Sequence, residues 1–443
     1  MATKIIEPVT SLDVDDGTII EGDPLSLHIF IFTACGLWSP GGWTSPWKKI
    51  FYNIYSLTII GTICFNCILQ SIDALTLTGS ISDLVERLYI LGAGCNLSYK
   101  AVNLITRRQD IIKLLTLPTS RRCRVLNRDE ERFKRRYHRR VRNATVLLCA
   151  VLEFTVINML ISSIRENIPE RTLPIKIWLP NNFTDDYRYW IIYGSQLIAF
   201  TYAGTFHVFY DTFIVGVMIT LCGHLQILQY RNSKISSSNR QFKNYNFGVE
   251  RGELSRYVEA NNISIKTKIE KNLILKAMEH YQQLLQFAKT FNEIIFYVIF
   301  VQYSISCFII SLSVYRLVNT SSTDPTYIFT IFYCGTVVIQ IFTYCWFGNE
   351  VILESANVSL SLYNSDWYTF NSETSRDFPI MLHRVQHHIE FSCTGLFVLS
   401  IDSFKNVSQK TLKTFTPSYS LILRPPLPAV PWDRHFVLDS SDT

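Results

Sequence analysis

The stretch Tyr344-Cys-Trp-Phe-Gly-Asn-Glu-Val-Ile-Leu-Glu-Ser355 decides the fold, because it lies where a long apolar segment turns polar. A second aromatic cluster, Tyr363-Asn-Ser-Asp-Trp367, follows shortly after it. Aromatic side chains at an apolar–polar junction are typical of a membrane–water interface. A buried helix of a soluble core would give the same local pattern, so the rest of the chain has to separate the two readings.

The composition excludes a disordered or fibrous protein and points towards a membrane protein. The 443 residues are 48% hydrophobic, and only 18% are charged, below the roughly 25% usual in soluble domains. Eleven cysteines show no regular framework spacing, which argues against a disulfide scaffold. Residues 1–27 are acidic and mixed, without a basic start, so no cleavable signal peptide is expected.

Seven apolar stretches separated by polar connections predict a polytopic, all-α membrane protein with seven transmembrane helices. The expected spans are residues 50–72, 84–106, 143–164, 189–228, 291–314, 327–347 and 395–423. The first span has no charge and is long enough to cross about 30 Å of hydrocarbon. The fourth is too long for one crossing, so it should continue beyond the bilayer as a helix. The second and seventh are weak, because the second carries Glu86, Arg87 and Lys100, and Pro417 breaks the seventh.

The distribution of lysine and arginine predicts the orientation of these spans. Residues 107–142 contain fourteen basic residues and residues 231–276 contain ten, whereas residues 315–325 contain only Arg316. We therefore expect a cytoplasmic N-terminal segment and an extracellular C-terminus. The remaining expected regions are residues 1–49 (cytoplasmic), 107–142 (basic cytoplasmic loop), 165–188 (extracellular loop), 229–290 (cytoplasmic loop and amphipathic helix), 348–394 (cytoplasmic helices) and 424–443 (tail).

Two further patterns agree with this orientation. The sequons at Asn182 and Asn319 both fall in expected outer connections, where they are candidate glycosylation sites. The arginine-rich run at residues 121–142 lies between two spans, which favours contact with anionic lipids of the inner leaflet over nucleic acid. We therefore expect membrane lipids, and no nucleic acid, among the partners.

Residues 266–290 have an apolar side chain every three or four positions, which predicts an amphipathic helix leading into the fifth span. The fourth span overruns inwards, and the sixth continues past Phe347. These helical extensions should pack together on the cytoplasmic side as an anchor bundle. Such a bundle could also provide a contact between subunits.

The chain resembles the insect odorant receptors. The resemblance rests on Gly36-Leu-Trp38, His280-Tyr-Gln-Gln-Leu-Leu-Gln-Phe287 followed by Gln302 and Ser306, the stretch at Tyr344–Ser355 with Tyr363 and Trp367, and Gly395-Leu-Phe397. It covers most of the chain, and its diagnostic part is residues 277–405. The pattern is similar to a tuning receptor rather than to the co-receptor.

This resemblance implies an odorant-gated, non-selective cation channel that forms a heterotetramer with the odorant receptor co-receptor. It implies a multi-pass protein of the plasma membrane of sensory-neuron dendrites, with the last span of each subunit at a central pore. Leu421 and Ile422 are then candidates for the gate. The candidate residues of the subunit anchor are His280, Leu284, Trp346, Gly348, Asn349, Glu350, Tyr363 and Trp367.

An odorant is small and mostly apolar, so its pocket should be apolar and aromatic with one or two polar groups. The resemblance implies a pocket in the outer halves of the second, third, fourth and sixth spans. By depth, the candidate residues are Tyr89, Phe154, Asn158, Tyr202, Phe332 and Tyr333. Glu153 is a further candidate, because a carboxylate within the bilayer is costly and often functional, and it could hydrogen-bond a polar odorant. An aromatic residue in a span more often serves ordinary helix packing than ligand contact, and Glu153 could instead tether two spans.

Other classes of function find less support in the sequence. There is no catalytic constellation and no cofactor motif, so we expect neither an enzyme nor a metal site. His383 and His387 are spaced for one helical face, but they lack a companion acid. A gustatory-type receptor or a G-protein-coupled receptor remains an alternative, although Asp-Arg-Tyr and Asn-Pro-x-x-Tyr are missing where the latter would carry them. A transporter would show inverted repeats, and none is apparent.

The residues after the seventh span depart from the family pattern. The segment Arg424-Pro-Pro-Leu-Pro-Ala-Val-Pro-Trp-Asp-Arg434 follows where family members usually end. It is either an unusual outer tail or the product of a faulty exon boundary, and we favour the second.

Overall fold

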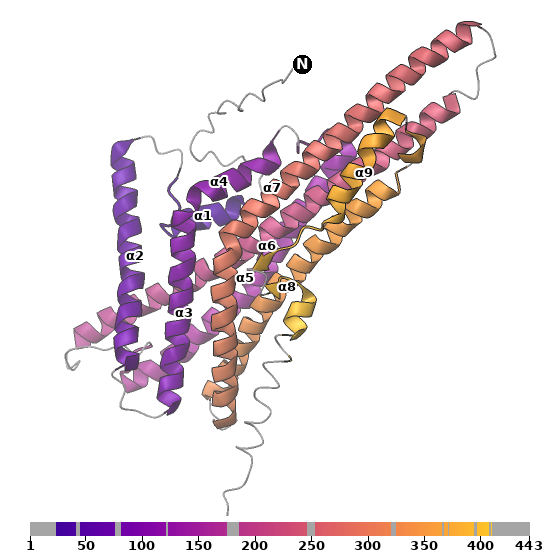
Figure 1. Ribbon diagram of the computed structural model, residues 1–443. Coiled ribbons are helices and arrows are strands. Elements are labelled where there is room, and N and C mark those ends of the chain that lie inside the picture. Colours follow the sequence, from indigo (N-terminus) through magenta and orange to yellow (C-terminus); the bar gives the residue numbers. More distant parts are fainter. Residues whose placement is uncertain are drawn as a thin grey trace, which may run out of the picture.

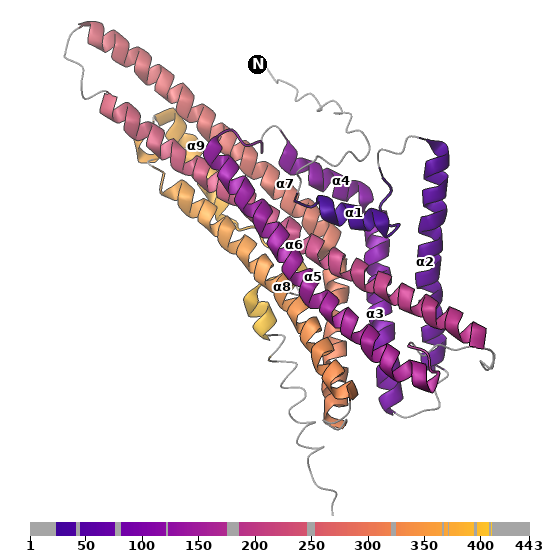
Figure 2. The same cartoon turned by 180° about the vertical axis from the view of Figure 1, so that it is seen from behind.

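Long helices, many of them strongly tilted against one another, make up the structure (Figures 1 and 2). The computed structural model describes residues 24–40, 45–75, 81–120, 123–174, 186–245, 253–319, 325–365, 367–370, 372–393, 397–406 and 409. The helices are α1 (Ser26–Ala34), α2 (Pro46–Leu75), α3 (Ile81–Thr106), α4 (Arg108–Thr116), α5 (Arg128–Glu170), α6 (Asp186–Tyr245), α7 (Glu253–Asn319), α8 (Pro325–Tyr363) and α9 (Ser372–Gln386). Two short 3-10 helices, η1 (Leu117–Thr119) and η3 (Trp367–Thr369), and a small hairpin of β1 (Ser392–Cys393) and β2 (Phe397–Val398) are also present.

Five described helices are long and apolar enough to cross a membrane, namely α2, α5, α6, α7 and α8. They contain the first, third, fourth, fifth and sixth stretches expected from the sequence. Helix α3 contains the second stretch but is not among the five, and its Lys100 is fully buried in the protein interior. The seventh expected span at residues 395–423 lies mostly outside the described residues, which reach only as far as a short helix at residues 401–406.

Helix α6 is the centre of the fold. At about 1.5 Å per residue its 60 residues extend for roughly 90 Å, about three times the hydrocarbon thickness. In its most apolar part, 94% of the residues are buried by other helices. Helix α5 packs along it, and Gly223 allows the close approach, because a Cβ there would lie 2.3 Å from the Tyr137 ring.

Helix α1 is embedded in the bundle, although its residues belong to the segment expected to be cytoplasmic. The Phe32 ring is fully buried and meets the rings of Phe206 and Phe213 on α6, with centroids 5.9 and 5.7 Å away. The turn after α1 depends on Gly36, whose φ of 70° is strained for other residues. The Tyr52 hydroxyl of α2 then donates to the Trp38 carbonyl at 2.7 Å, so the Gly-Leu-Trp motif connects α1 to α2.

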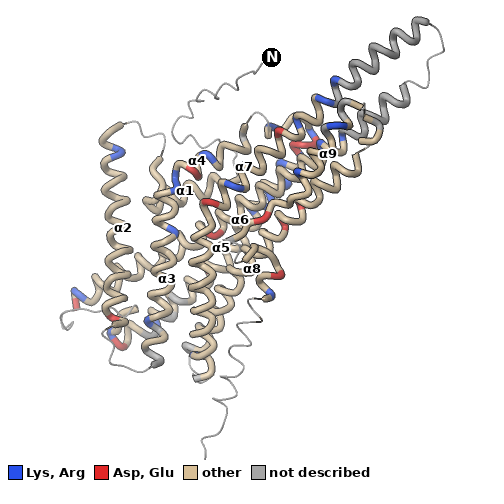
Figure 3. Tube along the Cα trace, in the orientation of Figure 1, with Lys and Arg blue, Asp and Glu red and all other residues tan. Residues whose placement is uncertain are grey.

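The ends of α6, α7 and α8 project together with α9 as an arm beyond the apolar part of the bundle (Figure 1). Charged residues are frequent at the level of α4 and α9 and sparse along the opposite halves of α3, α7 and α8 (Figure 3). Within the arm, the Trp367 ring stacks on Phe378 of α9 with centroids 5.4 Å apart. The arm thus has its own buried contacts, since Phe378 is only 1% exposed.

Candidate functional site

A large open cavity lies between α2, α3, α5, α6, α7 and α8, in their halves away from the arm. Its volume is about 1520 Å³, larger than the roughly 300–1,000 Å³ of typical ligand pockets. A small molecule would therefore occupy only one part of it. Its walls are mostly apolar, and residues such as Ile59, Ile90 and Val337 contribute to them.

Three of the seven residues predicted for the pocket line this cavity: Tyr89, Tyr202 and Tyr333. Tyr89 of α3 and Tyr333 of α8 form one aromatic wall, with ring centroids 5.4 Å apart. The Tyr89 hydroxyl donates to Ser313 of α7, which fixes the orientation of its ring. Tyr202 lies on α6, and its hydroxyl donates to the Cys35 carbonyl at the end of α1.

The other four predicted pocket residues are not among the lining residues. Phe154 and Phe332 are 54% and 48% exposed on the outer surface of the bundle, where their rings meet edge to face. Glu153 is half-buried and contacts the Thr205 side chain of α6. Asn158 donates to the Phe154 carbonyl of its own helix at 2.7 Å. Phe154, Asn158 and Phe332 were chosen by depth along a helix, and Glu153 by its charge within the bilayer. Neither criterion tells which side of a helix faces inwards.

Side-chain amides form a polar floor in the cavity. Asn96 of α3 donates to Gln302 Oε1 of α7 at 2.5 Å, and Gln302 donates to Ser306 Oγ at 3.1 Å. Gln302 Nε2 also lies 3.5 Å from Gln340 Oε1 of α8. Gln302 and Ser306 carried part of the family resemblance, but Asn96 and Gln340 were missed. Their signal was an amide within an apolar span, which is costly unless it has partners.

A buried ion pair lies beside this floor. Lys100 of α3 donates to Asp211 of α6, and the exposed fractions of the two side chains are 0% and 7%. The Tyr344 hydroxyl of α8 donates to the same carboxylate at 2.6 Å. His207, which lines the cavity, has its Nε2 3.3 Å from Lys100 Nζ. The first residue of the stretch Tyr344–Ser355 thus joins α8 to α3 and α6 next to the cavity.

The rest of that stretch connects α8 to other parts of the chain. Glu350 forms a two-pronged ion pair with Arg140 of α5, and Ser355 Oγ accepts from the Ile389 N–H at 2.9 Å. Gly348 is buried against the segment after the hairpin, since a Cβ there would lie 2.5 Å from the Leu399 carbonyl oxygen. Only glycine permits this approach of the two backbones.

The structure separates the remaining predicted anchor residues into three groups by burial. His280 and Leu284 are buried within the chain, at 0% and 2% exposure. Trp346 and Tyr363 are 47% and 59% exposed, so they are free to contact another molecule. Asn349 and Trp367 are half-buried. The predicted residues Asn182, Leu421 and Ile422 lie outside the described part of the chain, and Asn319 is the last residue of α7.

Apolar helices long enough to cross a bilayer, together with a mostly apolar internal cavity, define a polytopic, all-α membrane protein. The sequence profile of the 7tm Odorant receptor family matches residues 80–411. The chain belongs to this family, the insect odorant receptors. This match favours an odorant receptor over the gustatory-type and G-protein-coupled receptors considered from the sequence.

Individual relatives agree with this assignment. Odorant receptor 10 of Aedes albopictus is 21% identical over 250 residues, which cover 56% of this chain and 60% of the relative. The odorant receptor coreceptor of Drosophila melanogaster is 33% identical over 82 residues, 18% of this chain and 17% of its own length. The chain thus spans less than two thirds of the length of these curated relatives.

A solved structure shows the same fold. The olfactory receptor OR5 of Machilis hrabei superposes with a TM-score of 0.73 at 14% identity, covering 90% of this chain and 97% of the receptor. The same receptor solved in complex with eugenol gives a TM-score of 0.72. The fold is therefore that of a seven-span insect olfactory receptor.

Proposed function

We propose that this chain is the odorant-binding subunit of a ligand-gated, non-selective cation channel. In this proposal it assembles with the odorant receptor co-receptor as a heterotetramer in the plasma membrane of a sensory-neuron dendrite. Its N-terminus is cytoplasmic and its C-terminus is extracellular. Family membership supports the proposal, as does the existence of a related receptor solved with eugenol.

The observation that carries the proposal is the cavity with its aromatic wall and amide floor. A volatile molecule offers apolar surface, and burial of that surface contributes roughly 25 cal/mol per Å². One hydrogen bond to Asn96 or Gln340 would add about 1 kcal/mol and would orient an oxygen of the odorant. The ligand would thus bind mainly through shape and apolar contact, with the amides selecting among functional groups.

Helix α8 provides a route from the cavity to the pore. Tyr333 and Gln340 of α8 line the cavity, and Gly348 of the same helix packs against Leu399, near the start of the expected last span. A ligand that favours a shifted position of α8 would therefore move the start of that span. Gating requires that the ligand binds the open state better than the closed one, and Leu421 and Ile422 are the proposed constriction.

The arm is the proposed subunit anchor. Glu350 holds α8 against α5 inside one chain, and Trp346 and Tyr363 offer exposed aromatic surface for a neighbouring subunit. In the proposed orientation, the exposed arginines of α5 lie near the inner leaflet, and its anionic lipids attract them. The predicted glycosylation of Asn182 and Asn319 would place these residues on the outer side.

Two neighbouring residues of α8 provide a test. The receptor is expressed with its co-receptor, and currents are recorded from a panel of odorants. Tyr333→Ala should shift half-maximal concentrations up to roughly tenfold, since an aromatic contact contributes about 0.5–1.5 kcal/mol beyond its buried area. Phe332→Ala, on the outer surface, is the matched control and should leave them unchanged. Absence of current from every odorant despite confirmed surface expression would contradict the channel proposal, and equal shifts in both variants would contradict the pocket.

A further inference from the structure

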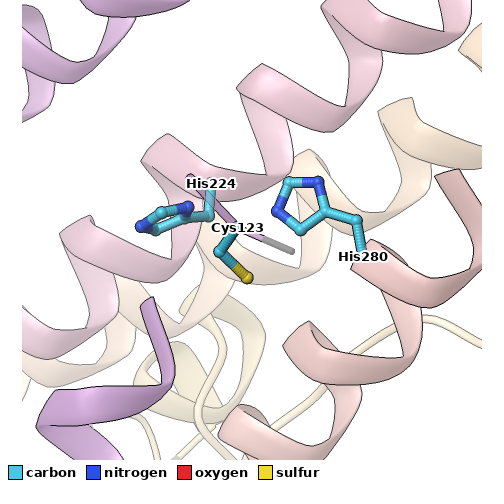
Figure 4. Close-up of side chains that lie close together, drawn as sticks. All are labelled: Cys123, His224 and His280. Atoms are coloured by element: carbon cyan, nitrogen blue, oxygen red, sulfur yellow. The ribbon is translucent and has the colours of Figure 1, made fainter. Parts of the chain in front are cut away.

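Three metal-ligating side chains meet at a second place, far from the cavity. Cys123 follows η1, His224 belongs to α6 and His280 belongs to α7. One ligand atom of each lies within 4.8 Å of the other two, and Figure 4 shows Cys123 between the two imidazole rings. The three residues are 2%, 3% and 0% exposed.

Two imidazole nitrogens of this cluster are available to bind a metal ion. His224 Nδ1 and His280 Nε2 are buried and have no hydrogen-bond partner within the described residues. Such atoms are rare in folded proteins, because their loss of contact with water is costly. A cavity of about 10 Å³ lies beside two of the three side chains and is lined by Cys123, His224 and Gln283. A volume of roughly 10–15 Å³ holds a single water-sized occupant.

We propose that Cys123, His224 and His280 bind a soft d10 metal ion, Zn²⁺ or Cu⁺. One thiolate and two neutral imidazoles are ligands that both ions prefer. Ligand distances of about 2.0–2.3 Å place such atoms roughly 3.5 Å apart, so the cluster needs only a small inward movement of its side chains. The Cys123 thiol loses its proton to water when the Sγ–metal bond forms. Zn²⁺ would take a fourth ligand, either a water in the small cavity or Gln283 Oε1, which is 3.1 Å from Cys123 Sγ.

The surrounding residues both support and limit this site. The Tyr137 hydroxyl lies 3.4 Å from His224 Nε2, so it can hold the nitrogen that does not bind metal. Arg231 Nη1 lies 3.2 Å from His280 Nδ1 and brings a positive charge close to the ion. Glu130 neutralises this charge, since its carboxylate accepts from Arg231 Nε at 3.0 Å and from Nη2 at 2.9 Å. Metal binding through His280 Nε2 places the proton on Nδ1, so Arg231 would have to move towards Glu130.

A bound ion would join three parts of the chain that are far apart in sequence. Because Cys123 lies between η1 and α5, His224 on α6 and His280 on α7, the ion would cross-link the α4–α5 connection to both long helices. This role is independent of odorant binding, so the channel proposal can fail without affecting it.

The test uses the full-length protein in detergent. After removal of metal by a chelator, the protein is titrated separately with Zn²⁺ and with Cu⁺, and bound metal per chain is measured by mass spectrometry. We expect one ion per chain. Loss of a residue that supports a metal ligand without binding the ion lowers metal affinity roughly 10–100-fold, and we expect a decrease in that range for Glu130→Gln. Cys123→Ser and His224→Gln remove a ligand itself, so each should lower the metal affinity by more than that. Cys222→Ser is the matched control, because this buried thiol of α6 is not part of the cluster.

Substitution with Co²⁺ keeps the proposal testable if a variant fails to fold. A thiolate ligand produces a sulfur-to-Co²⁺ charge-transfer band in the unmodified protein, and we expect this band to disappear when Zn²⁺ is added. A protein that binds neither Zn²⁺ nor Cu⁺ and shows no such band would overturn the proposal. Loss of metal from Cys222→Ser equal to that from Cys123→Ser would overturn it as well.

Discussion

The substitution Asp211→Asn should be among the most damaging single changes in the described part of the chain. It removes the negative charge next to Lys100 but keeps nearly the same side-chain volume. Lys100 is fully buried and its ammonium group has no access to water. The variant therefore isolates the effect of leaving one buried charge without its counter-charge.

The magnitude follows from the burial of both partners. Breaking a buried ion pair on one side costs about 3–5 kcal/mol, because the remaining charge stays desolvated. Tyr344→Phe removes only one hydrogen bond to the carboxylate, so it should cost about 1.5–3 kcal/mol. Asp110→Asn, in an exposed pair with Arg107 at 3.4 Å, is the control and should cost less than about 1 kcal/mol.

The assay is thermal unfolding of the purified receptor in detergent, monitored by size-exclusion chromatography. Surface expression in cells is measured alongside. The double variant Lys100→Met/Asp211→Leu distinguishes lost charge pairing from lost packing. Replacement of both partners by apolar residues is often neutral or stabilising, so the double variant should be clearly more stable than Asp211→Asn. A double variant as unstable as the single one, or an Asp211→Asn variant as stable as the unmodified protein, would refute the reasoning.

Three further predictions concern α8 and the basic end of α5. Gly348→Ala should destabilise the receptor by about 1–3 kcal/mol through overpacking. Gly335→Ala should not, because a Cβ there meets nothing within 4 Å. Comparison of the unfolding midpoints of the two variants tests this. Glu350→Ala and Arg140→Ala should lower surface delivery by similar amounts, and the double variant should be no worse than either, as counted by surface labelling. Burial and a neighbouring lysine lower the pKa of His138 from 6.5 to about 4. The unfolded chain therefore binds a proton first, and stability should fall as the pH drops from 6.5 towards 4, but less steeply in His138→Gln when unfolding is measured across that range.

The position of Tyr344 gives the stretch Tyr344–Ser355 a more definite role than an aromatic collar. Its first residue contacts the ion pair beside the cavity, Gly348 contacts Leu399 near the start of the expected last span, and Glu350 contacts α5. One helix therefore connects the proposed ligand site, the approach to the proposed pore and the anchor. We expect substitutions along it to affect folding, delivery and gating together.

Much of the architecture is determined by the sequence alone. Hydrophobic stretches of sufficient length identify helices independently of their neighbours, because a backbone in lipid must satisfy its hydrogen bonds within its own segment. The all-α class, the overlong α6, the continuous helix from the amphipathic region into the fifth span, and the family motifs are all local or nearly local features. They could therefore be predicted before any contact was known.

The candidate sites depended on tertiary structure. Tyr333 and Phe332 are adjacent and of similar character, yet one lines the cavity and the other is on the outer surface, because helix rotation is set by packing. The charge of Lys100 makes the second stretch a poor membrane span when only the sequence is considered. In the structure this charge is paired with Asp211, more than a hundred residues later. Sequence determined which segments are helices in a membrane, because that depends on each segment's own hydrogen bonds and polarity. Only the packing of the helices decided which side chains meet, because contacts across the bundle are set by rotations and tilts that no single segment encodes.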